Sequence, residues 1–193
     1  MGAAVTSAVD AIAQLAADNA NGTVLTINEL RALAESVSAA SSSPNGVLYS
    51  GPLNSTTQAF EAASSVANSM GWGVIDATQR ATLLNSTDFQ AALQDAIQSE
   101  TGLTGGELNA AVNQTLYASG ATGAVDGGQS FWSQASVEYT ESLTGEILTL
   151  TPNATPNGVF EVDELNAALA NPDGGAINGI PRSQLIETEQ TFG

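Results

Sequence analysis

The chain has 193 residues, of which 42% are hydrophobic, so it is long enough to build one core or two small ones. The chain has 20 acidic residues but only three basic ones. The resulting net charge of -17 argues against nucleic-acid binding and attraction to anionic membranes. Because the chain has no histidine, cysteine or lysine, the usual zinc sites, disulfides, serine–histidine catalysis and Schiff bases are excluded. No apolar run approaches the roughly 20 residues that cross a bilayer, so we expect no membrane insertion.

Apolar residues recur at helical spacing along three segments, and the sequence predicts a helix in each. The segments are residues 5–15, 89–97 and 108–116. Thr87 and Thr104 each precede Gln or Glu by three residues, which is the spacing of a capping box and predicts helix starts there. The prolines lie where loops or first helical turns are expected, as an all-helical fold requires.

The sequence contains an internal repeat. Residues 21–34 parallel residues 157–170, with one residue inserted after the first glycine. Each copy is followed by a segment that reads glycine, small apolar, branched apolar, three variable residues and proline, at residues 46–52 and 175–181. A related pair with glutamine at the last position occupies residues 73–79 and 123–129. These observations predict six loops in three pairs.

Two of the six loops carry oxygen donors at spacings that suit calcium. Residues 153–164 form a twelve-residue segment with glycine at the sixth place, an apolar residue at the eighth and glutamate at the twelfth. The candidate ligands of this fifth loop are Asn153, Thr155, Asn157, the Val159 carbonyl, Glu161 and Glu164. Those of the first loop are Asp18, Asn21, the Val24 carbonyl, Thr26 and Glu29.

The donors of the first loop can also be interpreted as helix-capping residues that bind no metal. Asp18 can simply end the first helix, and Thr26 with Glu29 has the spacing of a capping box for the second helix. The other four loops end in Pro52, Pro181, Gln79 or Gln129 instead of glutamate, so we expect them to serve as paired turns.

These loops resemble those of the EF-hand superfamily, including its dockerin-like members. The resemblance covers the loops and their following helices, and it implies an all-α fold of paired helix–loop–helix units with calcium as the cofactor. It also implies short antiparallel β-bridges at the eighth place of each loop, between Leu25 and Leu48, Ile75 and Val125, and Phe160 and Ile177. The expected regions are residues 1–66, 67–145 and 146–193 within one compact domain.

The leading functional expectation is a non-enzymatic, extracellular or cell-surface structural subunit that calcium stabilises and that self-associates into an oligomer or filament. Five Asn-X-Ser/Thr triplets fit a glycosylated extracellular surface, although a chain rich in these residues also produces them by chance. The first alternative is a dockerin-like module that binds a protein partner. The second is a carboxylate-based hydrolase using a pair drawn from Asp76, Asp126, Glu138 and Glu141.

Overall fold

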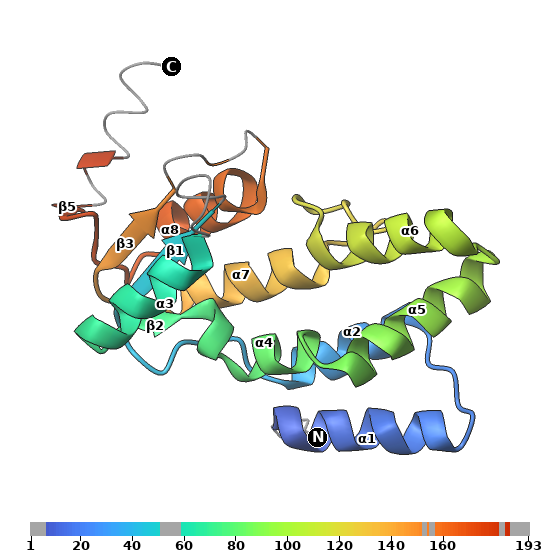
Figure 1. Cartoon of the computed structure of the whole chain (residues 1–193). Helices are drawn as coiled ribbons and strands as arrows, with labels where there is room; N and C mark the ends of the chain where they lie inside the picture. Colours follow the sequence, from blue (N-terminus) through green and yellow to red (C-terminus); the bar gives the residue numbers. More distant parts are fainter. Residues whose placement is uncertain (1–6, 51–58, 152–153, 155–156, 182–183, 186–193) are drawn as a thin grey trace. The chain divides into compact units, whose positions relative to one another are not determined.

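A computed structural model describes residues 7–50, 59–151, 154, 157–181 and 184–185 (Figure 1). The chain divides into two units, each built from two stretches of sequence. Residues 1–39 and 78–135 form the helical unit, and residues 40–77 and 136–193 form the sheet unit. The sheet unit holds a five-stranded, mostly parallel sheet, so the prediction of an all-α fold is wrong.

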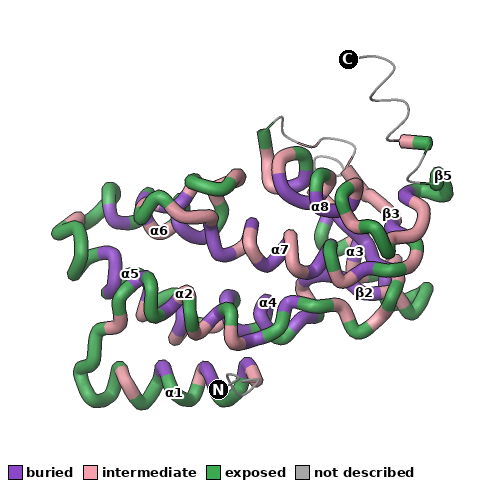
Figure 2. Tube along the Cα trace, turned by 180° about the vertical axis from the view of Figure 1, so that it is seen from behind, coloured by how far each residue is buried: buried purple, intermediate pink, exposed green. Residues whose placement is uncertain are grey.

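The helical unit is built from helices that pack on one another. Helices α4 (Gln79–Leu84) and α5 (Thr87–Thr101) each contact both α1 (Ala8–Ala20) and α2 (Ile27–Ser36). Helix α6 (Gly105–Tyr117) packs on α5. Figure 2 shows buried and exposed residues alternating along these helices, as an apolar stripe of period 3.6 requires.

Of the first predicted helix segment, residues 8–15 lie in α1, while residues 5 and 6 lie outside the described residues. The other two predicted segments are confirmed. Residues 89–97 lie in α5 and residues 108–116 lie in α6. The cap of α5 is Ser86, one residue before the predicted position, and Thr104 caps α6 without a side-chain hydrogen bond. Local capping chemistry therefore locates these helix starts to within one residue.

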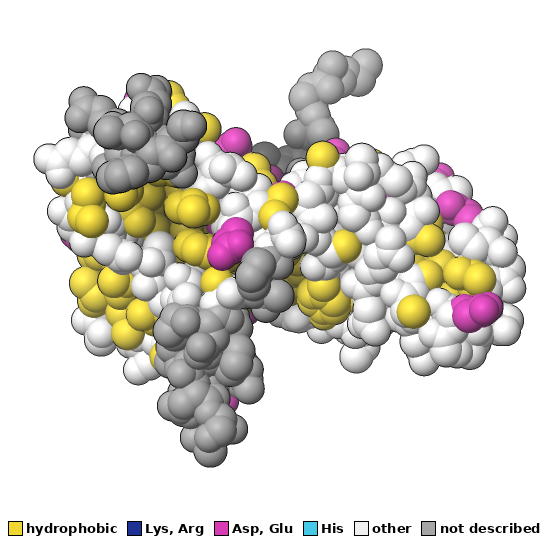
Figure 3. All heavy atoms as spheres, turned by 90° about the horizontal axis from the view of Figure 1, so that it is seen from above, with side chains coloured by type: hydrophobic (Ala, Val, Ile, Leu, Met, Phe, Trp, Pro, Cys, Tyr) yellow, Lys and Arg dark blue, Asp and Glu magenta, His cyan; other side chains and the backbone are white. Residues whose placement is uncertain are grey.

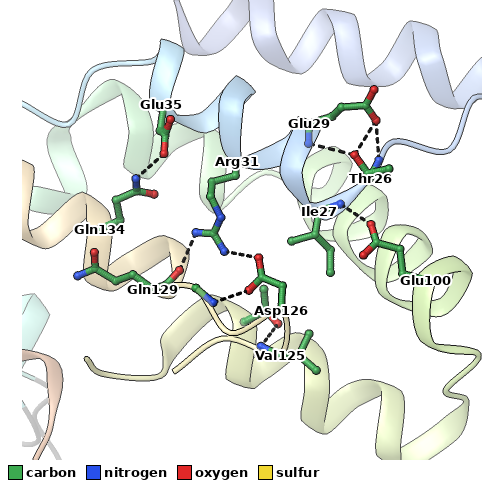
Figure 4. A network of polar contacts seen from close by, with 12 residues as sticks. Thr26, Ile27, Glu29, Arg31, Glu35, Glu100, Val125, Asp126, Gln129 and Gln134 are labelled. Carbon is green, nitrogen blue, oxygen red and sulfur yellow. Dashed lines mark hydrogen bonds and ion pairs between the residues drawn. The ribbon is translucent and has the colours of Figure 1, made fainter. Parts of the chain in front are cut away.

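Arg31 ties α2 to the loop that precedes α7 (Phe131–Glu141) (Figure 4). One guanidinium nitrogen lies 2.8 Å from a carboxylate oxygen of Asp126, and another donates to the Gln129 carbonyl at 2.6 Å. The guanidinium carbon also lies 5.0 Å from the ring centroid of Phe131. The same Phe131 ring meets Phe89 edge-on, with centroids 5.1 Å apart, so this ion pair is joined to the apolar core of the unit.

The sheet unit is an α/β arrangement with strand order β2-β1-β3-β4-β5. The strands are β1 (Gly46–Tyr49), β2 (Gly73–Val74), β3 (Ile147–Leu150), β4 (Ala176–Ile177) and β5 (Ile180–Pro181), and only β5 pairs antiparallel. Helix α3 (Ala59–Met70) connects β1 to β2. The short helices η1 (Ile75–Ala77), η2 (Phe160–Glu164) and α8 (Leu165–Ala170) follow strands β2 and β3.

Three copies of the repeated glycine-apolar motif mark strands of this sheet, whereas the copy at residues 123–129 is a loop of the helical unit, as predicted. The predicted antiparallel bridges between paired loops are wrong. Gly46 and Gly73 begin β1 and β2 and face each other in parallel register, while Gly175 immediately precedes β4. Ile177 pairs with Ile147 and Ile180 instead of with Phe160. A short run of branched apolar residues after glycine suits a buried parallel strand as well as a loop, and the repeat could not distinguish the two.

Helices cover both faces of the sheet. Val47 and Val74 pack with Ala63 and Ala67 of α3 in one apolar cluster. A Cβ placed on Gly46 would point toward Tyr139 of α7, so this residue faces the other side. Because successive strand residues face opposite sides, α3 and the last turns of α7 cover opposite faces of the sheet.

We expect Gly46→Ala to destabilise the sheet unit by about 1–3 kcal/mol, since its Cβ would lie 2.6 Å from both the Tyr139 hydroxyl and a Leu143 methyl group. Both of those side chains are fully buried, so they have little room to move. Urea unfolding measures the change. Gly106→Ala is the control, because its Cβ meets nothing within 4 Å and an added Ala in α6 should leave stability equal or slightly higher. Equal unfolding curves for wild type and Gly46→Ala would contradict the close approach of α7 to β1.

Candidate functional site

Two polar side chains meet at the carboxyl ends of β1 and β2. Tyr49 is the last residue of β1, and Asp76 lies two residues beyond the end of β2. The Tyr49 hydroxyl donates a hydrogen bond of 2.6 Å to Asp76 Oδ2. In open parallel sheets, the carboxyl ends of the strands are where ligands usually bind.

Glu164 is the buried carboxyl group of this region. Its side chain is only 5% exposed, and it ends η2, a π-helical turn in which the Leu165 N–H bonds to the Phe160 carbonyl. Such turns inside helices occur often at functional sites. The Oε2 atom of Glu164 is buried and has no hydrogen-bond partner among the described residues. An unpartnered buried carboxyl oxygen is costly, and function is a common reason for such a cost.

The surroundings of Glu164 favour its protonated form. Burial raises the pKa of Glu164 to about 7; the nearby Ser136 hydroxyl opposes this rise, and the negative charges of Asp163 and Asp76 add to it. A pKa close to the working pH is one property that a general acid needs. Asp76 provides a second acidic group close enough to act on it electrostatically.

Tyr139 and Tyr49 remain protonated in the same region. Burial raises the pKa of Tyr139 far above its ordinary value, and the charges of Glu164 and Asp76 reinforce this despite the opposing backbone N–H of Val47. The buried Tyr139 hydroxyl has no hydrogen-bond partner among the residues that the structure describes. Burial is also the largest cause that raises the pKa of Tyr49, and the hydrogen bond from Tyr49 to Asp76 raises it further. We name Asp76, Glu164, Tyr49, Ser136 and Tyr139 together the carboxylate site.

The predicted ligands of the fifth loop separate into different environments. Asn153 and Thr155 lie outside the described residues. Asn157 has a φ of 64°, and its N–H lies 3.4 Å from a carboxylate oxygen of the exposed Glu161. Val159 precedes η2 with helical dihedral angles, and Glu164 turns into the interior. Within the described part of the chain, no three acidic side chains form a group suited to a metal ion.

Three of the five predicted ligands of the first loop belong to helix caps. Thr26 and Glu29 form the complete capping box of α2, in which Glu29 accepts from both the N–H and the hydroxyl of Thr26 (Figure 4). Asp18 belongs to the last turn of α1, and Asn21 is its C-cap. Val24 lies in the connection that follows. In this structure Thr26 and Glu29 therefore have structural roles at the start of α2.

Of the four acidic residues considered for catalysis, Asp76 is the one that the structure brings into the carboxylate site. Asp126 belongs to the helical unit, where Arg31 pairs with it. The Glu141 carbonyl accepts a hydrogen bond from Asn171. The sequence analysis predicted Glu164 as a metal ligand and not as a catalytic residue, although one pattern in the sequence indicates that its side chain is buried. Phe160, Ala167 and Ala168 are buried at helical spacing around it, which places an acidic residue on an apolar face.

Among the described residues, no helix has both the length and the apolar character needed to span a membrane. Comparisons with protein-family models, curated proteins and solved structures found no match.

Proposed function

We propose that this protein is a hydrolase that cleaves glycosidic bonds, with Glu164 as the general acid and Asp76 as its charged partner. The observation that carries the proposal is a buried carboxyl group with a pKa near 7 beside a second carboxyl group, at the carboxyl edge of a parallel sheet. Two acidic groups held in different environments are the usual arrangement for dividing acid and base roles.

The charges of the sheet unit support a reaction that develops positive charge. Its described residues include no lysine, arginine or histidine, whereas Asp76, Asp163 and Glu164 act on one another. On the face drawn in Figure 3, acidic side chains are visible among the described residues and basic ones are not. Hydrolysis of esters or phosphates develops negative charge and needs cationic groups or other aligned donors, while glycosidic cleavage passes through an oxocarbenium-like cation.

In the proposed reaction, protonated Glu164 gives its proton to the leaving atom of the substrate as the glycosidic bond breaks. The Asp76 carboxylate stabilises the positive charge that develops on the sugar carbon. Water then adds to that carbon and returns a proton to Glu164, which restores the starting state. Tyr49 holds Asp76 through its hydroxyl during these steps.

Cleavage of a glycoside panel tests this proposal. The panel holds 4-nitrophenyl O-glycosides, followed by absorbance, and nucleosides as N-glycosides, followed by release of the base. We expect the wild type to cleave at least one compound and Asp76→Asn to lose about 10²–10⁴-fold in kcat. Asp173→Asn, an exposed acidic residue of the same unit, is the matched control and should keep full activity. Absence of cleavage across both classes, or full activity in Asp76→Asn, would contradict the proposal.

A calcium-stabilised extracellular subunit is the second candidate, and one observation favours it. The unpartnered Oε2 of Glu164, at the twelfth place of the fifth loop, is an oxygen that a cation could bind. Under this candidate, millimolar calcium raises the melting temperature of the wild type and of Gln79→Ala but not of Glu164→Gln. Light scattering in the same samples tests self-association. Identical melting curves with calcium and with chelator would contradict this candidate.

A further inference from the structure

A hollow of about 200 Å³ lies in the sheet unit where two helices end. Glu141 is the last residue of α7 and Ala170 is the last residue of α8. Both line the hollow, together with Ala167, Asn171 and Pro172. The hollow thus offers methyl groups and a proline ring beside one carboxyl group and one amide.

The Asn171 side chain connects the ends of the two helices. Its amide nitrogen donates to the Glu141 carbonyl at 2.9 Å and to the Leu143 carbonyl at 3.1 Å, while its Oδ1 accepts from the Asp173 N–H at 3.0 Å. These bonds hold the C-cap of α8 against the end of α7, so the hollow is formed before any ligand arrives. Because the Asn171 amide is engaged in them, the Glu141 carboxylate is the main polar group that the hollow offers to a ligand.

The electrostatics of the hollow favour a cation. The C-terminal end of a helix carries partial negative charge, and here the ends of α7 and of α8, which continues η2 in helical conformation, meet at one hollow. Neither helix has a basic residue in its last turn. Glu141 adds a negative charge at this unfavourable position, and among the described residues its carboxylate has no hydrogen bond or ion pair. A bound cation would offset both effects.

We propose that the hollow binds the side chain of a lysine on a basic protein partner. The four methylene groups of the lysine cover the methyl groups and the proline ring, and its ammonium group meets the Glu141 carboxylate. Lysine suits the hollow better than arginine, because the five lining residues include no aromatic ring on which a guanidinium group could stack. The net charge of -17 also attracts a basic partner. The hollow shares no residue with the carboxylate site, so the proposal stands whether or not the protein cleaves glycosides.

Proton–nitrogen NMR of the whole chain, titrated with Nα-acetyl-lysine methylamide at pH 7, tests this proposal. We expect saturable shifts of the amide signals at the end of α8, with a dissociation constant on the order of millimolar. Glu141→Gln should fold, because it removes an unfavourable charge from a helix end, and should weaken binding about two- to fivefold. Ala170→Leu should abolish binding by filling the hollow. Glu146→Gln is the matched control, since it removes the same charge from an exposed position of the same unit outside the hollow.

Two further probes separate the possible ligands. Nα-acetyl-norleucine methylamide has the same four-carbon stem without the charge, and it should shift the signals less than the lysine compound at equal concentration. Shifts that do not saturate, or equal affinity of the wild type and Glu141→Gln for the lysine compound, would overturn the proposal. Putrescine that bound at least tenfold more tightly than the lysine compound would also overturn it, because the hollow would then be a site for a free amine.

Discussion

Glu164→Gln should make the protein more stable at pH 8 than the wild type, by up to about 3 kcal/mol. The folded pKa of about 7 lies above the ordinary value of 4.5, and each pKa unit corresponds to about 1.4 kcal/mol. The folded state therefore holds the proton more tightly than the unfolded chain. This stabilisation is fully present below about pH 4.5, falls as pH rises and is lost above about pH 7. A neutral glutamine avoids the cost of ionising a buried group.

Urea unfolding of the wild type and Glu164→Gln between pH 4.5 and pH 8 measures this effect. The difference between the two curves isolates Glu164, because the other carboxyl groups are common to both proteins. Glu161→Gln is the matched control, since its side chain is exposed and only three residues away. The prediction fails if the stability difference between wild type and Glu164→Gln does not grow with pH over this range.

Arg31→Met should destabilise the helical unit by about 2–4 kcal/mol at pH 7. The change leaves the Asp126 carboxylate, 19% exposed, without its partner and removes the bond to the Gln129 carbonyl. Methionine retains the apolar length of the side chain, so the loss reports the polar contacts more than the packing. Arg31→Lys should recover only part of the stability, because one ammonium group cannot reproduce the planar fork of guanidinium donors.

The effect of Arg31→Met should shrink in acid. Burial would raise the pKa of Asp126, but the Arg31 hydrogen bond, the Gly128 N–H and the Arg31 charge outweigh it and hold the pKa below 3.8. The pairing therefore stabilises the folded protein above that pH and is lost as pH falls through the lowered folded pKa. Unfolding of the variant and the wild type at pH 7 and near pH 3 measures this change. A difference that stayed constant between the two pH values would show that the ion pair is not its source.

Sequence patterns predicted local structure well and the fold class poorly. The capping box at Thr26 and the apolar stripes of α5 and α6 depend on neighbouring residues, and these predictions held to within one residue at the helix starts. The error arose at Gly46 and Gly73, where a glycine followed by apolar residues was interpreted as a loop. Their identity as strands depends on pairing partners distant in sequence, which a repeat inside one chain does not reveal.

The sequence predicted a catalytic role for only one of the two acidic residues of the carboxylate site, for the same reason. Asp76 was one of four acidic residues considered for catalysis, and its proximity to Glu164 depends on contacts between β1 and η2, which are distant in sequence. The twelve-residue spacing indicated Glu164 as a metal ligand because of its carboxylate oxygens, while its raised pKa depends on burial. Residue spacing does not measure desolvation, and desolvation is the largest cause of its raised pKa.

The pH dependence of glycoside cleavage tests the central claim most directly. If Glu164 is the general acid, kcat/KM of the wild type falls as pH rises through about 7, while Glu164→Gln is about 10²–10⁴-fold slower and lacks this decline. A wild-type profile that stays level through pH 7, or a Glu164→Gln variant as active as the wild type, would contradict the assignment of Glu164.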